Sequence, residues 1–261
     1  MATSQQLVDG WQTATEQIRK RVLAYVLAVW GNSPSYRDED VSRLIARILP
    51  VVQSGQLQVA QLTDAYIGRM AALAGVTWAS GVARAEIIDY RGIPPVEVYR
   101  RPATTIYTAL SKGVSYLDAV ARSEARLGSL VATDLQQAKN RQATASIGRS
   151  GFSLFRRVLT GAENCGLCAI ASTNTYSRGD LMPIHPDCDC GVEPIVRRAA
   201  SSVPASVLTQ TRGIISNRSG STAEGPLSSF RDLITVNTHG ELGPTLGWAS
   251  DHFTSAADLG L

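Results

Sequence analysis

The chain of 261 residues carries a net charge of +3 and is long enough for one large domain or two smaller ones. Hydrophobic residues make up 44% of it but aromatic residues only 6%, which favours helices packed on helices over a β-sandwich. No apolar run approaches about 18 residues, and charged side chains interrupt residues 1–30, so the sequence predicts neither a membrane span nor a signal peptide.

The first third of the chain predicts amphipathic helices. Apolar residues recur at steps of three, four and seven over residues 4–31, and a Gly-Asn-Ser-Pro sequence ends this helix. A second helix begins near Asp38, and Pro50 is expected to kink or end it. A third covers residues 56–74 after an interruption at Ser54-Gly55. We expect their apolar faces to form a plain helical core; the alternative is that one of them faces a partner subunit.

Residues 75–104 are rich in Gly and Pro and predict an irregular stretch. It carries several basic and aromatic side chains: Tyr90, Arg91, Tyr99, Arg100 and Arg101. A solvated loop with anchoring tyrosines is favoured over a surface that binds nucleic acid. The following stretch, about residues 115–145, has high helix propensity and predicts the longest helix, roughly 45 Å. Residues 1–150 are therefore expected to form a helical body.

The remainder predicts a small β module and a tail. Residues 152–159 and 192–196 favour strands, so residues 151–196 are interpreted as a small sheet that carries a metal knuckle. Residues 197–261 are rich in Ser, Thr, Gly and Pro, and predict an extended tail. Its apolar side chains are candidate anchors for a partner, or else fold back onto the chain: Leu242, Trp248 and Phe253. The predicted fold class is mainly α with a small β element (α+β).

All four cysteines lie in one short stretch. Cys165 and Cys168 form a C-x2-C pair, and His185, Cys188 and Cys190 follow as H-x2-C-x-C. Thiolates and imidazole at these spacings are typical zinc ligands. We expect the four cysteines to bind one structural zinc ion, with His185 as a substitute ligand or an outer hydrogen-bond donor. Two disulfides or four free thiols remain the alternative.

The sequence lacks the common catalytic motifs. The sequence has no GxSxG, HExxH or P-loop pattern, and its three histidines have no nucleophile-base arrangement around them. A four-ligand metal site leaves no open position for a reacting water. The sequence therefore predicts a protein that is not an enzyme, although a zinc-knuckle nucleic-acid-binding protein remains an alternative.

The knuckle and its flanks resemble a known family. The pattern R-V-x-x-G-x-x-x-C-x-x-C followed by H-P-x-C-x-C is similar to that of the Mu F-like minor capsid proteins, or phage head morphogenesis proteins, of the actinobacteriophage branch. The resemblance covers residues 155–195, with a weaker match at residues 239–244. It is carried by Arg157-Val158, Gly161, Cys165, Cys168, His185-Pro186, Cys188 and Cys190.

The resemblance implies a structural role in a virion. Members associate with the portal vertex inside the head, in several copies, and assist head assembly or DNA packaging. The implied partners are the portal protein and, second, the major capsid protein, with packaged DNA nearby and no membrane. Assembly in the host cytoplasm would keep the cysteines reduced and available to zinc.

Overall fold

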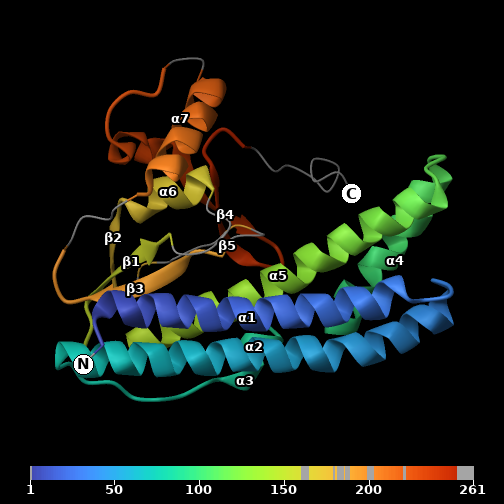
Figure 1. Cartoon of the computed structure of the whole chain (residues 1–261), viewed down its shortest axis with the longest axis horizontal. Helices are drawn as coiled ribbons and strands as arrows, with labels where there is room; N and C mark the ends of the chain where they lie inside the picture. Colours follow the sequence, from blue (N-terminus) through green and yellow to red (C-terminus); the bar gives the residue numbers. More distant parts are fainter. Residues whose placement is uncertain are drawn as a thin grey trace.

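The computed structural model describes residues 2–159, 165–178, 180, 185, 189–198, 203–219 and 222–251. Figure 1 shows a body of long helices and, next to it, a smaller part made of strands and short helices. The described residues are mostly helical, with two small antiparallel sheets, which confirms the predicted mainly α fold with a small β element. Every helix in these ranges is too short or too polar to span a bilayer.

The body is made of five helices: α1 (Ser4–Gly31), α2 (Asp38–Ala74), α3 (Arg84–Ile88), α4 (Pro95–Ser111) and α5 (Tyr116–Gly148). α1 and α2 lie side by side in opposite directions, and α5 packs across both and against α4 (Figure 1). Trp30, Ile48 and Leu127 are fully buried where these helices meet. Each such side chain contributes about 1.5–3 kcal/mol by leaving water. The Trp30 indole N–H is also satisfied, because it donates to Ser123 Oγ at 2.9 Å.

The bounds of α1 match the prediction, but those of α2 do not. α2 continues through Pro50 and Gly55, so the predicted break and interruption are wrong, and with 37 residues it is longer than α5 with 33. Pro50 is exposed while Ile48 and Val52 beside it are buried, so the hydrogen bond that proline cannot donate is lost on the solvent side. Gly55 is a contact point, since a Cβ there would lie 2.8 Å from Val22 Cγ2 of α1.

The predicted irregular stretch is also largely wrong, because α3 and α4 lie within residues 75–104 or begin there. Pro95 stands in the first turn of α4, where a helix needs no N–H donor. Tyr99 is buried and Tyr90 donates to a buried carboxylate, so both anchor the stretch to the body and neither offers a face for base stacking.

A three-stranded antiparallel sheet follows the body. It has the order β2-β1-β3, from β1 (Leu154–Val158), β2 (Thr175–Ser177) and β3 (Gly191–Ile195). β1 and β3 confirm the two predicted strands, whereas β2 and the short helix α6 (Gly166–Ser172) were not predicted. Phe155 of β1 lies opposite Tyr176 of β2 and Pro194 of β3, and it packs toward the body with Phe152 and Val192.

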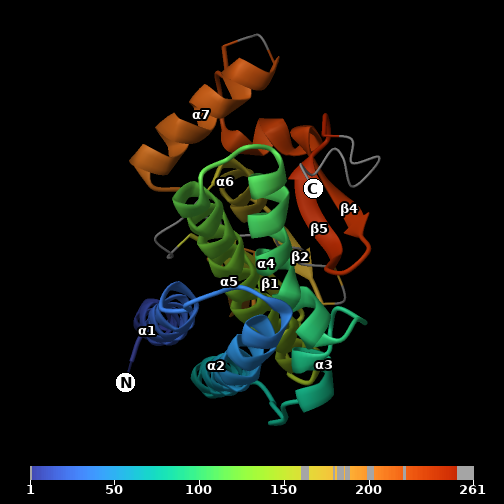
Figure 2. The same ribbon diagram turned by 90° about the vertical axis from the view of Figure 1, so that its right-hand side faces the viewer.

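The expectation of an extended tail without a core of its own is wrong for the described part of residues 197–261. It contains α7 (Ala205–Ser219), the 3₁₀ helix η1 (Leu227–Leu233) and a hairpin of β4 (Ile234–His239) and β5 (Gly243–Trp248). Trp248, Ile215 and Leu227 form a small core with Ile170 of α6. In Figure 2 the hairpin lies beside α4 and α5, and Glu241 in its turn pairs with Arg101 of α4. The hairpin strands also contact α6.

Candidate metal centre

Three of the five predicted ligands come together at the start of α6. Cys165 caps the helix, and its sulfur accepts from the backbone N–H of Cys168 at 3.4 Å. His185 Nε2 lies 2.7 Å from Cys165 Sγ and 3.5 Å from Cys168 Sγ. The three donor atoms lie within 4.8 Å of one another, so this group could hold a metal ion.

The surroundings of Cys165 favour the thiolate, which is the form that binds metals. A hydrogen bond from the Cys168 side chain, followed by the interaction with His185, lowers the pKa of Cys165 from 9.0 to about 4, against the opposing effect of burial. Cys168 is fully buried, so its sulfur faces the group and not the solvent. Two thiolates and one imidazole are a donor set typical of zinc and unsuited to Mg²⁺ or Ca²⁺, which prefer oxygen.

Cys190 lies near this group but is not part of it. Its sulfur is 2.7 Å from Nη1 of Arg157, which also lies 3.7 Å from the Cys168 sulfur. The sequence predicted Cys190 as a ligand and His185 only as a substitute ligand or an outer hydrogen-bond donor. In the structure His185 lies beside the cysteine pair, and the Cys190 sulfur contacts Arg157. Cys188, the remaining predicted ligand, lies outside the described residues.

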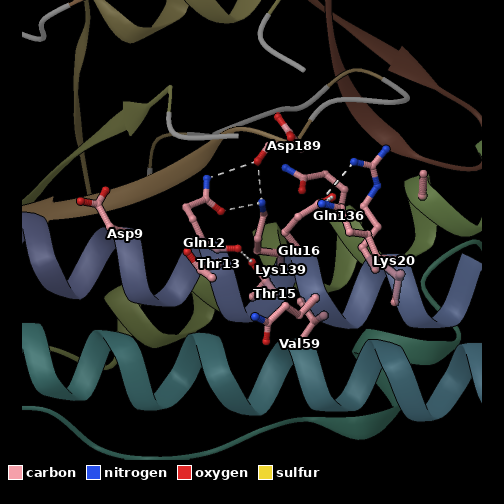
Figure 3. Close-up of a pocket in the computed structure, with 14 residues that line it drawn as sticks. Asp9, Gln12, Thr13, Thr15, Glu16, Lys20, Val59, Gln136, Lys139 and Asp189 are labelled. Atoms are coloured by element: carbon pink, nitrogen blue, oxygen red, sulfur yellow. Dashed lines mark hydrogen bonds and ion pairs between the residues drawn. The ribbon is translucent and has the colours of Figure 1, made fainter. Parts of the chain in front are cut away.

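Buried polar side chains of the helical body hold the backbone next to Cys190. Lys139 Nζ of α5 donates to the carbonyl oxygen of Asp189 at 2.7 Å, and Gln12 of α1 donates to the same oxygen at 3.3 Å. Gln136 of α5 donates to the carbonyl oxygen of Cys190 at 2.9 Å. Figure 3 shows these side chains converging on Asp189 from two helices, beside a cavity of about 580 Å³.

These contacts were missed in the sequence because they join residues far apart in the chain. Lys139 is only 5% exposed, which is unusual for a lysine, and its ammonium is compensated by Gln12 Oε1 at 3.2 Å and by the Asp189 carbonyl. One signal was present: Lys139 is one of only three lysines in the chain and falls on the apolar side of its helix.

The predicted partner anchors that the structure describes are buried within this chain itself. Trp248 is 8% exposed and packs in the core with Ile170 and Ile215, close enough to α6 that a Cβ on Gly166 would lie 3.4 Å from its ring. Leu242 is buried as well. Phe253 lies outside the described residues. The described anchors therefore stabilise the fold of this chain.

Comparison with known proteins gives no further identification, since no family model, no characterised protein sequence and no solved structure matches the chain.

Proposed function

We propose that this chain is a metal-stapled structural protein, in which Cys165, Cys168 and His185 bind one zinc ion together with Cys188 or Cys190. The observation that supports this most directly is the approach of His185 Nε2 to both sulfurs of the C-x2-C pair. Structural zinc sites take four such donors in a tetrahedron. The ion would supply cross-linking, because its ligands come from α6 and from the segment that leads into β3.

The helical body would set the position of that second segment. Lys139 and Gln136 hold the carbonyls of Asp189 and Cys190 from α5, and α6 packs against Trp248 of the C-terminal hairpin. A metal bound between them would fix the sheet, the hairpin and the body relative to one another. Zinc-binding free energy of this kind becomes folding free energy.

We further propose that the chain acts in the head of a tailed bacteriophage, as a minor capsid protein at the portal vertex. The support is the resemblance of residues 155–195 to the Mu F-like proteins, together with a mainly helical body that precedes the knuckle in the order the resemblance implies. In this role the protein contacts the portal protein, and also the major capsid protein, and assists head assembly or DNA packaging without catalysing a reaction.

The metal is tested by elemental analysis of the purified chain. We expect one zinc ion per chain, which the double variant Cys165→Ser/Cys168→Ser loses. Single variants Cys188→Ser and Cys190→Ser identify the fourth ligand, because only the true ligand should reduce the metal content. A chain without bound metal, or a double variant that retains it, would contradict the proposed centre.

The virion role needs a separate measurement. We expect the chain to occur in purified heads of the phage that encodes it and to co-sediment with assembled portal rings. The Cys165→Ser/Cys168→Ser variant should co-sediment less, since its C-terminal part is no longer stapled. Heads that lack the protein, combined with no binding to portal rings, would refute the virion role and leave the metal centre intact.

A further inference from the structure

Four arginines surround the turn of the β4–β5 hairpin where it meets the helical body. They are Arg91, which follows α3, Arg101 of α4, and Arg126 and Arg141 of α5. In Figure 1 this hairpin reaches the middle of α5, far from the metal ligands in sequence. So many guanidinium groups around one turn need negative charge, because each of them remains protonated in a protein.

Two carboxylates provide part of that charge. Asp134 is 5% exposed and accepts from Arg91 at 2.5 and 3.1 Å and from the hydroxyl groups of Tyr90 and Tyr99. Glu241, in the hairpin turn, accepts from both terminal nitrogens of Arg101 at 2.6 and 2.9 Å and from Arg91 at 3.3 Å. Arg91 and Arg101 are thus compensated by carboxylates.

Arg126 and Arg141 are not compensated in this way. Within the described residues, Arg126 has no hydrogen bond or ion pair, and its Nε is buried. The Nε of Arg141 is likewise buried without a partner; its guanidinium stacks over Tyr90 at 4.8 Å and makes one long contact of 3.5 Å with the carbonyl of Leu242. Burial lowers the pKa of both arginines. At Arg126 the charge of Arg101 adds to this effect and Glu241 partly opposes it, and at Arg141 Tyr90 and Glu86 partly oppose it. A buried donor without a partner destabilises the folded chain.

We propose that this arginine cluster binds a phosphate group, and that the Glu241 carboxylate is an internal competitor for the same arginines. Guanidinium groups donate pairs of hydrogen bonds that match phosphate oxygens, and phosphate offers more oxygens and more charge than one carboxylate. It can accept from Arg101 and Arg126 together, whereas among the described residues the Glu241 carboxylate accepts from Arg101 and Arg91.

The cluster is accessible at its rim. The side chain of Arg101 is 33% exposed and that of Glu241 25%, while Arg91 behind them is 9% exposed. An anion from solvent therefore meets Arg101 first, with Arg126 beside it on α5. The phosphate could belong to a nucleic-acid backbone or to a small phosphate compound. The argument for this site, between the helical body and the hairpin turn, rests on neither the proposed metal nor the virion role.

The test measures binding of inorganic phosphate and pyrophosphate by calorimetry, and of a short fluorescein-labelled DNA duplex by anisotropy, with the full chain. We expect Arg126→Gln to weaken binding about tenfold, the effect of one charge-assisted hydrogen bond. Glu241→Gln should strengthen binding by about threefold or more, because the competitor is removed. Arg122→Gln is the matched control, an exposed arginine one turn earlier on α5, and it should change the affinity by less than about twofold.

The ligands distinguish the two sources of phosphate. A nucleic-acid backbone is indicated if the duplex binds tightly and pyrophosphate displaces it. In Arg126→Gln the slope of the logarithm of the binding constant against the logarithm of the salt concentration should then be smaller by about one. Binding of pyrophosphate without the duplex indicates a small phosphate compound. The proposal is overturned if neither wild type nor Glu241→Gln binds any of the three ligands, or if Arg122→Gln weakens binding as much as Arg126→Gln. Circular dichroism of each variant verifies that the helical body is intact.

Discussion

Replacing Arg157 should weaken metal binding although this residue is not a ligand. Its side chain is 1% exposed, and its Nη1 lies 2.7 Å from the Cys190 sulfur and 3.7 Å from the Cys168 sulfur. A guanidinium at this position partly offsets the negative charge that several thiolates place around one divalent ion. Arg157→Met keeps much of the side-chain volume and removes the charge and its hydrogen bonds.

The expected loss follows from these contacts. One hydrogen bond to a charged group in a buried site contributes about 1.5–3 kcal/mol, which corresponds to about 10- to 100-fold in affinity. Outer partners of metal ligands show effects of the same size when they are removed. Zinc affinity is measured by competition with a coloured chelator at pH 7. Arg157→Lys should lose less, because it retains a positive charge near the sulfurs.

Arg156 is the matched control for this experiment. It precedes Arg157 on β1, and it pairs with Glu193 through 2.7 and 2.8 Å contacts on the other side of the strand. Arg156→Met should leave the zinc affinity within about twofold of wild type, since its described contacts are with Glu193. An affinity of Arg157→Met within the same limit, in a folded variant, would refute the idea that Arg157 supports the metal centre.

Three further variants test the body and its contact with the hairpin. Asp134→Asn should lower the free energy of unfolding by about 3 kcal/mol in urea titrations, because the buried Arg91 loses its 2.5 Å ion pair and keeps the longer 3.3 Å contact with Glu241; an unchanged midpoint would contradict this pairing. Hydrogen bonding by Arg101 lowers the pKa of Glu241 below 4.5, so the stability it adds is present above that pH and is lost as the pH falls through the lowered value. Wild type should therefore exceed Glu241→Gln by about 1 kcal/mol at pH 7, and this difference should shrink as the pH falls through the lowered pKa; a difference that stays constant with pH would contradict the assignment. Pro50→Ala should raise the thermal midpoint, with a gain of up to about 3 kcal/mol, since the helix regains a hydrogen-bond donor at an exposed position; a lower midpoint would show that the proline is needed.

Local signals in the sequence located the first helix and the first strand well, but long-range packing decided the rest. Residues 4–31 have a periodic apolar face, a capping box at Thr3 and a clear stop, and their bounds are correct. Pro50 is a strong local signal for a break, yet the buried side chains on either side hold α2 together. The polar C-terminal segment folds because α6 supplies Ile170 as a surface for Trp248, which no local pattern contains.

The metal site likewise depends partly on local sequence signals and partly on long-range packing. C-x2-C spacing predicts correctly that Cys165 and Cys168 lie together, because a helix cap formed by four consecutive residues achieves it. Whether His185 or Cys190 joins them depends on where the body holds the second segment, and Arg157 competes for the Cys190 sulfur. Five donors for four positions cannot be ranked from spacing alone, since the ranking depends on contacts across more than a hundred residues, such as the one from Gln12 to Asp189.

The C-terminal hairpin links the two sites that the structure suggests. One end is fixed by Trp248, which packs on α6 beside the C-x2-C pair, and the other by Glu241, which pairs with Arg101 of the body. Loss of the metal would loosen the first attachment, and an anion at the arginines would weaken the second. Because the metal favours the attached hairpin and an anion that displaces Glu241 favours its release, each is expected to weaken binding of the other.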